Sequence, residues 1–293
     1  MKFIDPRIDF AFKKIFGSED TKDILISFLE SLMGLEGEKR IRRITLLDPY
    51  LLPKIRGLKT SILDVRCTDH RGVSYIVEMQ IANVRGFLKR IQYNAAKMYV
   101  SQIASGTDYP KLNQVIAVTI TDFTLFDEDE ISHWLSCHVT VEKKTRKNYL
   151  SDIIYYFIEL PKFDKTADRL GTVLDRWVWF LKKAGDLEEV PEAFQQEPFA
   201  HAFEKALVVN MDKEEFELYE KAGMALTDAK GAIELAREEG REEGREEGEE
   251  RGIRKGRKEE KEETARKLIA MEMSADEISQ VTGLSAEEVD ALR

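Results

Sequence analysis

The sequence contains few of the residues that build thiolate metal centres and redox pairs. It has 2 cysteines and 4 histidines in 293 residues, and no C-x-x-C or H-x-x-x-H spacing occurs among them. These absences disfavour a structural zinc site and a dithiol redox centre. Cys67 and Cys137 are therefore expected to be reduced, structural residues.

Long apolar runs are also missing. The stretch MKFIDPRIDFAFKKIFG alternates charged and apolar side chains, unlike the core of a signal peptide, and no later run is long enough to cross a bilayer. A cytoplasmic protein without membrane association is expected. A G-x-S-x-G elbow and a complete G-x-x-x-x-G-K-[ST] phosphate loop are absent, which disfavours serine-hydrolase and P-loop chemistry.

The charge of the chain is unevenly distributed. The net charge is -10, yet residues 1–100 carry 18 basic and 12 acidic side chains, whereas residues 186–293 carry 16 basic and 31 acidic ones. A local positive field attracts a polyanion whatever the total charge, so the basic first third can approach phosphate. A mixed, solvated surface would account for the same composition.

The residue patterns divide the chain into four segments. Residues 1–165 show two helical patterns, three strand patterns, a long amphipathic helix and further strands, and residues 166–235 turn helical. Residues 236–263 form a charged run with glycine at every fourth position, which cannot bury a core and is expected to be a helical linker. Residues 264–293 contain two capping boxes and predict a small helical module with the layout of a helix-turn-helix.

The stretch ILDVRCTDHRGVSYIVEMQ combines two strand patterns with a turn between them. Because side chains alternate along a strand, Leu63, Val65 and Cys67 are expected on one face, and Ile62, Asp64 and Arg66 on the other. On the return strand, Glu78 and Gln80 share one face. The three polar side chains can therefore lie on the same face of a hairpin.

The turn sets the register of this hairpin. A three-residue loop with Gly72 in the left-handed conformation would pair Asp69 with Val73, and the same register places Asp64 opposite Glu78. Facing carboxylates repel one another unless a cation, a proton or a basic side chain lies between them. Oxygen ligands of this kind suit Mg²⁺ or Mn²⁺.

An ordinary surface hairpin would show the same spacing. In that interpretation the acids are solvated or paired with Arg66 or Lys59. The order of the elements, with the Asp strand and the Glu-x-Gln strand between helices, favours the metal-binding interpretation instead.

Three stretches carry a family resemblance: DPRIDFAFKKIFG, SILDVRCTDHRGVSYIVEMQ and RIQYNAAKMYVSQIASGTDY. They resemble successive motifs of the Rpn family of recombination-promoting nucleases and transposases, within the PD-(D/E)XK nuclease superfamily, over roughly residues 1–160. The resemblance implies an α/β (α+β) restriction-endonuclease-like fold, with a mixed central sheet flanked by helices. It also implies metal-dependent hydrolysis of DNA linked to recombination or to mobile elements.

The resemblance assigns roles to individual residues. Asp64 and Glu78 would be catalytic metal ligands for Mg²⁺ or Mn²⁺, Gln80 would occupy the usual lysine position, and Asp9 would add an acid from the first helix. Asp9 can equally be a helix-start acid paired with Lys13.

Two basic residues on the helix that follows the hairpin, Arg90 and Lys97, are candidates for binding DNA phosphate. Ordinary solvated helix positions would explain them as well. If both DNA strands are cut, a homodimer is expected.

A second interpretation keeps the nuclease fold but not its activity. The protein would then be a catalytically weak or inactive DNA-binding adaptor that contacts a protein partner through its charged C-terminal tail. The last helix of the tail would begin with Glu287, Glu288 and Asp290, and these acids would repel phosphate. Partner contact or simple capping is thus expected of the tail, rather than DNA reading.

Overall fold

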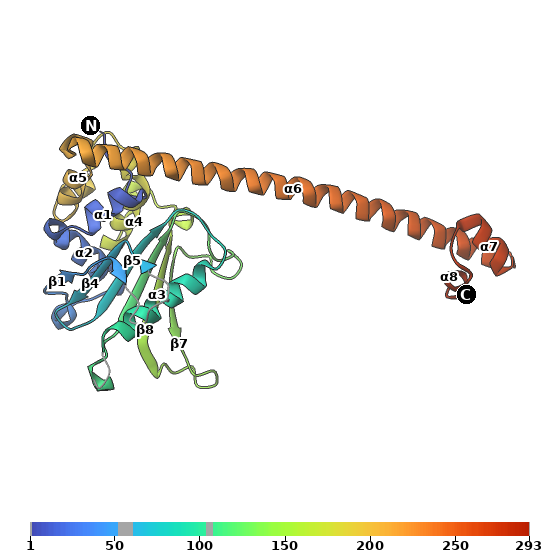
Figure 1. The fold of residues 1–293 in the computed structure, drawn as a ribbon, viewed down its shortest axis with the longest axis horizontal. Helices are drawn as coiled ribbons and strands as arrows, with labels where there is room; N and C mark the ends of the chain where they lie inside the picture. Colours follow the sequence, from blue (N-terminus) through green and yellow to red (C-terminus); the bar gives the residue numbers. More distant parts are fainter. Residues whose placement is uncertain (1, 52–60, 104–107, 293) are drawn as a thin grey trace. The chain divides into compact units, whose positions relative to one another are not determined.

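The computed structural model describes residues 2–51, 61–103 and 108–292 (Figure 1). They form two compact units, Met1–Ala229 and Lys230–Arg293. None of the helices in the described parts of the chain combines the length and the apolar character needed to cross a membrane.

The first unit contains a mixed six-stranded sheet. Its strands, in spatial order, are β1 (Ile44–Leu46), β4 (Val65–Asp69), β5 (Ser74–Gln80), β6 (Val115–Thr121), β8 (Leu150–Glu159) and β7 (Leu135–Thr140). The pairs β1–β4, β4–β5 and β7–β8 are antiparallel, whereas β5–β6 and β6–β8 are parallel. Strand β6, VIAVTIT, is buried along its whole length, as expected of a parallel strand covered on both faces. A separate antiparallel pair is formed by β2 (Tyr50–Leu51) and β3 (Ser61–Ile62).

Helices flank this sheet. They are α1 (Asp9–Phe16), α2 (Lys22–Met33), α3 (Phe87–Ser101), α4 (Val173–Lys183), α5 (Phe199–Ala206) and the first part of α6 (Lys213–Ala270). Helix α2 is capped at its C-terminus by Gly34, which adopts the left-handed conformation at φ 60°. Helix α4 begins with a capping box between Thr172 and Asp175. The mixed sheet with flanking helices confirms the predicted fold class.

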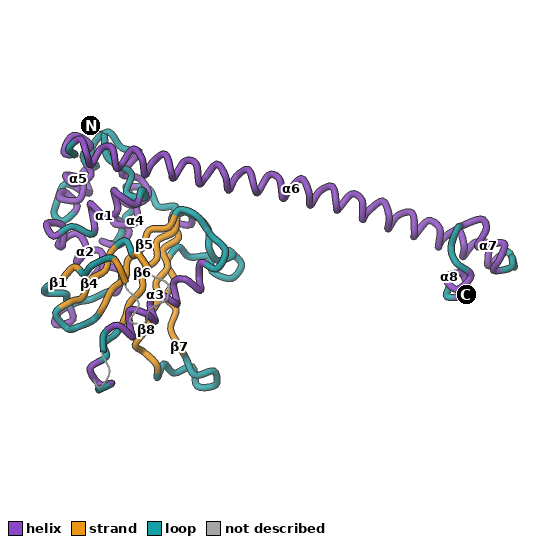
Figure 2. Tube along the Cα trace, viewed as in Figure 1, coloured by secondary structure: helices purple, strands orange, loops and turns teal. Residues whose placement is uncertain are grey.

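The sheet separates two hydrophobic clusters. Tyr75, Val77 and Met79 of β5 belong to the larger cluster, which contains the buried faces of α1, α2, α4 and α5. Ile76 belongs to the smaller cluster, which includes the buried face of α3. Figure 2 shows α3 alongside the strands, while α1, α2, α4 and α5 gather together. Because side chains alternate, Glu78 shares the face of Ile76 and points toward α3.

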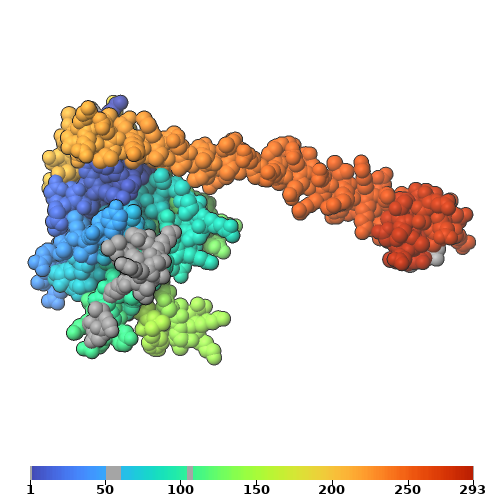
Figure 3. All heavy atoms as spheres, in the orientation of Figure 1, coloured from blue at the N-terminus to red at the C-terminus, as the bar shows by residue number. Residues whose placement is uncertain are grey.

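The first part of α6 packs on the N-terminal segment within this unit (Figure 3). The hydroxyl of Tyr219 accepts a hydrogen bond of 3.0 Å from the Asp5 backbone N–H, and Lys14 forms an ion pair with Glu215. Leu226 joins the larger cluster. The helical region after the sheet thus contributes to the same core.

The second unit consists of the remainder of α6 together with α7 (Ala275–Thr282) and α8 (Ala286–Asp290). The predicted capping boxes are confirmed at Ser274 and Ser285. Their helices bury Ile278 and Val289 against the end of α6. The glycine-rich run is helical throughout, with ion pairs such as that between Arg245 and Glu249, four residues apart.

Candidate active site

The hairpin between β4 and β5 has the register predicted from its turn. The backbone N–H of Asp69 donates a hydrogen bond of 3.0 Å to the carbonyl oxygen of Val73, and Val65 lies opposite Val77. Gly72 adopts a φ of 88°, in the left-handed region. The turn and the alternation therefore set the register as expected.

The chain bends immediately before β4. Strand β3 ends at Ile62 and β4 begins at Val65. Leu63 packs in the cluster that contains α3, whereas Val65 belongs to the other cluster. The expectation that both share one face is wrong, because the interruption at Leu63 and Asp64 breaks the strand alternation.

Asp64 lies in this bend, one step beyond the last ladder pair. Its side chain is 13% exposed, and its Oδ2 accepts a hydrogen bond of 2.8 Å from the backbone N–H of Met79. Burial raises the pKa of this carboxyl to about 7, and the negative charges of Asp9 and Glu78 add to the shift, whereas the Met79 N–H and Lys13 oppose it. A cation at this position would relieve the cost of ionising Asp64.

Glu78 is buried beneath α3. Its Oε1 accepts a hydrogen bond of 3.1 Å from Asn94 Nδ2, and Gln80 Nε2 lies 3.5 Å from its Oε2. Burial raises the pKa of Glu78, while Arg90 and Asn94 oppose the rise. The buried Glu78 and the largely buried Asp64 thus come from neighbouring segments, and the negative charge of Glu78 contributes to the raised pKa of Asp64.

Asn94 is a site residue that the sequence reasoning missed. It lies on the buried face of α3, among Ile91, Ala95 and Met98. A polar residue on the apolar face of an amphipathic helix is a usable signal, because a buried amide requires a partner. The sequence pattern predicted an amphipathic helix here but did not single out Asn94.

The two basic candidates on α3 have different surroundings. Arg90 Nη2 donates a hydrogen bond of 2.5 Å to Gln80 Oε1, and its guanidinium lies 5.4 Å from the centre of the Phe87 ring. Lys97 lies two turns further along, with its Nζ 5.7 Å from the centre of the Tyr93 ring. Arg90 is therefore joined to the Glu-x-Gln stretch.

Asp9 is an exposed acid paired with Lys13. The Lys13 Nζ lies 2.7 Å from Asp9 Oδ1 and 3.7 Å from Asp64 Oδ1. The Asp9–Lys13 pair expected of an ordinary surface acid is present, and the same lysine also lies near Asp64. Arg66, by contrast, donates to the carbonyl oxygen of Asp48 at 2.7 Å.

The surface-hairpin interpretation also named Lys59 as a partner for the acids. Lys59 lies outside the described residues.

The donor set fits a hard divalent cation. Asp64 and Glu78 offer carboxylate oxygens, and the buried Asn94 Oδ1 has no hydrogen-bond partner among the described residues. Mg²⁺ and Mn²⁺ prefer oxygen ligands and usually retain several waters, so a small number of protein ligands suffices.

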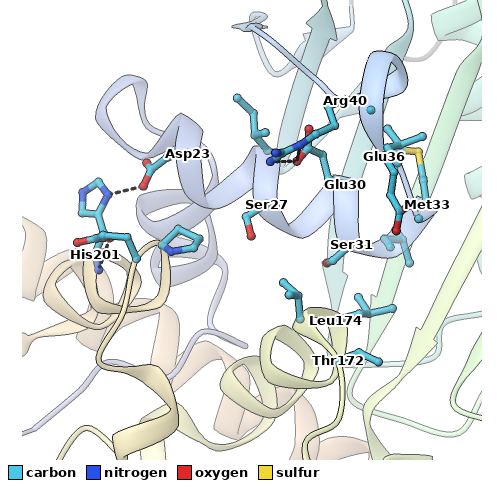
Figure 4. Close-up of a pocket in the computed structure, with 18 of the residues that line it drawn as sticks. Asp23, Ser27, Glu30, Ser31, Met33, Glu36, Arg40, Thr172, Leu174 and His201 are labelled. Carbon is cyan, nitrogen blue, oxygen red and sulfur yellow. Dashed lines mark hydrogen bonds and ion pairs between the residues drawn. The ribbon is translucent and has the colours of Figure 1, made fainter.

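A second group of metal-type ligands lies elsewhere in the first unit. Asp23 of α2, His201 of α5 and Glu197, which precedes α5, have ligand atoms within 4.8 Å of one another. His201 Nδ1 and Asp23 Oδ2 are 2.9 Å apart (Figure 4), and the backbone N–H of His201 donates to Glu197. They border a groove of about 1340 Å³ that includes Glu30 and Arg40. The group links two helices and shares no residue with the carboxylates of the hairpin.

Comparison with known families places these features in context. Residues 6–236 match the family model described as PD-(D/E)XK nuclease family transposase. This match confirms the resemblance seen in the three motifs and extends it over α4, α5 and the start of α6. Neither the curated proteins nor the solved structures yielded a match to the chain.

Proposed function

Because the chain belongs to the PD-(D/E)XK nuclease family of transposases, we propose that it is a divalent-metal-dependent endodeoxyribonuclease. The observation that carries the proposal is the pair of carboxylates formed by Asp64, whose side chain is 13% exposed, and the buried Glu78. Asp64 is oriented by the backbone N–H of Met79, and Glu78 by the amide of Asn94. Keeping two such acids buried is costly unless a cation offsets their charge.

The proposed ligands for Mg²⁺ or Mn²⁺ are Asp64 and Glu78, with the exposed Asp9 as an additional acid. The ion, when bound, lowers the pKa of a coordinated water and offsets charge on the phosphate that is attacked. The protein's contribution is to hold the carboxylate oxygens in place before DNA arrives, through the Met79 N–H and the Asn94 amide.

Gln80 and Arg90 complete the proposed site. The amide of Gln80 can orient a water or a phosphate oxygen but carries no charge. Arg90, held by Gln80 Oε1, can donate to a phosphate oxygen with its remaining N–H groups. Lys97 would contact the DNA backbone further along α3.

Nicking of supercoiled plasmid DNA tests this function. With Mg²⁺ or Mn²⁺ the protein should convert supercoiled DNA to open circles, and chelation should stop the reaction. Asp64→Ala and Glu78→Gln should each lower the rate by about 1000-fold or more while the proteins remain folded, because each removes a ligand charge. His201→Gln is the matched control, since it removes a member of the second ligand group and should leave nicking unchanged. Full activity in both carboxylate variants would refute the proposed active site.

The proposed domain organisation, biological role and oligomeric state follow from the nuclease function. Residues 1–165 would be the nuclease domain, residues 166–235 would complete its core, and residues 236–263 would link it to a terminal module at 264–293. A role in recombination or in mobile-element processes would use the DNA-cutting activity, and a homodimer would allow both strands to be cut. DNA binding without cleavage would instead favour the adaptor function of the charged tail.

A further inference from the structure

The Glu78-x-Gln80 stretch of β5 carries no cation of its own. The general PD-(D/E)XK superfamily motif ends in lysine, whereas Gln80 presents a neutral amide that lies 3.5 Å from Glu78 Oε2 and accepts a hydrogen bond from Arg90. Hydrolysis of a phosphodiester develops negative charge at the phosphate, and a nearby cation stabilises that charge. The amide of Gln80 cannot provide this stabilisation.

Lys13 brings an ammonium group to the same carboxylates from another element. From α1, its Nζ lies 2.7 Å from Asp9 Oδ1 and 3.7 Å from Asp64 Oδ1. The longer distance exceeds that of a hydrogen bond, so the attraction to Asp64 is one of charge. An ammonium group has three N–H donors, so binding to Asp9 leaves donors for a phosphate oxygen.

The position of Lys13 follows from the amphipathic pattern of α1. Ala11, Phe12 and Ile15 are buried, and Lys13 lies at the border of this face with a half-buried side chain. Its stem can therefore pack against the protein while the charged end reaches solvent. Lys14, the next residue, instead pairs with Glu215 of α6.

The basic residues of α3 are arranged differently. Arg90 is held by Gln80 Oε1 and packs against Phe87, on the Glu78 side of the site. The ammonium of Lys97 lies over Tyr93.

We propose that Lys13 supplies the positive charge that Gln80 lacks, by contacting the phosphate beside Asp64 during cleavage. This inference rests on the proposed nuclease function.

The test separates a role in the reaction from a structural role. Lys13→Met should slow single-turnover nicking about 100-fold, the loss typical of one transition-state contact, and Lys13→Arg should retain most of the rate. The neighbouring variant Lys14→Met is the matched control and should nick at the wild-type rate. Adding Gln80→Lys to Lys13→Met should raise the nicking rate at least about tenfold above that of Lys13→Met alone, because strand β5 would then carry a lysine.

Two binding measurements accompany the rates. Mn²⁺ alone, titrated by electron paramagnetic resonance, should bind Lys13→Met at least as tightly as wild type, because a competing cation has been removed from Asp64. In the presence of Ca²⁺, the affinity of Lys13→Met for a labelled DNA duplex should be less than about tenfold weaker than that of the wild-type protein. Tenfold weaker Mn²⁺ binding would show that Lys13 only positions the ligands, and would overturn the inference.

The outcomes also separate this inference from the function on which it rests. A wild-type rate for Lys13→Met, beside an inactive Asp64→Ala, would overturn the role of Lys13 alone. The same conclusion would follow from a slow Lys13→Met that Gln80→Lys does not improve. Absence of nicking by the wild-type protein would refute the nuclease function, and the role of Lys13 with it.

Discussion

Glu78 and Asn94 are joined by a hydrogen bond of 3.1 Å between the sheet and α3, and both side chains are buried. The Asn94 amide on α3 holds one carboxylate oxygen of Glu78 on β5, across a contact between helix and sheet that is otherwise apolar. The bond therefore couples the packing of α3 to the position of a proposed metal ligand.

Replacing Asn94 tests this coupling. Asn94→Leu should weaken Mn²⁺ binding by about 10-fold or more, because Glu78 loses the donor that orients it. Isothermal titration calorimetry with Mn²⁺ measures the change. Gln92→Leu on the exposed side of α3 is the control, since its side chain donates to the Leu88 carbonyl oxygen within the same helix. Equal affinities in the two variants would contradict a positioning role for Asn94.

The pKa of Asp64 predicts how stability depends on pH. Burial raises this pKa to about 7, so the folded state binds the proton more tightly than the unfolded state does. The stabilisation is fully present below the unfolded pKa, near 4, and is lost as pH rises through about 7. In metal-free protein, Asp64 should therefore lower the free energy of unfolding by up to about 1.4 kcal/mol per pH unit between those values.

Urea unfolding at a series of pH values, with a chelator present, measures this slope. Asp64→Asn should be less sensitive to pH than wild type over the same window. Identical slopes in the two proteins would mean that Asp64 titrates normally in the folded state.

Alanine is expected to destabilise the protein to different extents at Gly72, in the hairpin turn, and at Gly86. Gly72 and Gly86 adopt φ values of 88° and 81°, so alanine would be strained at both by about 1 to 2 kcal/mol. An added Cβ at Gly72 would also lie 2.8 Å from Asn113 Nδ2, whereas at Gly86 no heavy atom of the described residues would lie within 4 Å of it. Gly72→Ala should therefore lower the free energy of unfolding more than Gly86→Ala does, in chemical denaturation. The reverse order would contradict the close contact.

The ion pair between Lys162 and Glu159 should be important for stability. Its side chains are 2% and 1% exposed, and Lys162 Nζ lies 3.0 Å from Glu159 Oε2. Lys162→Met would leave a buried carboxylate without its cation and should destabilise the protein by about 3 to 5 kcal/mol. Lys183→Met removes an exposed pair with Asp186 and should change stability by less than about 1 kcal/mol. Thermal unfolding of both variants provides the comparison.

Local rules were sufficient for the hairpin register and for the terminal caps. Side-chain alternation and the left-handed glycine at position 72 placed Val65 opposite Val77, as observed. The serine of each capping box accepts from the backbone N–H three residues later. These features depend on residues close together in sequence, whose geometry is restricted by the backbone itself.

The same rules failed where tertiary packing overrides them. Alternation predicted Leu63 and Val65 on one face, but the chain bends between them, and Leu63 packs with the buried face of α3. In the bent segment Asp64 accepts the Met79 N–H. A pattern of alternating residues carries no information about where a strand is interrupted.

Side chains distant in sequence complete the candidate site, and only the packed fold brings them together. Lys13 approaches Asp64 because α1 packs on one face of the sheet, whereas Asn94 reaches Glu78 because α3 covers the other. The sequence alone determined the family, the order of the elements and the acidic motif. The partners of each acid were decided by tertiary packing, since such contacts depend on the distance and angle between elements rather than on any local spacing.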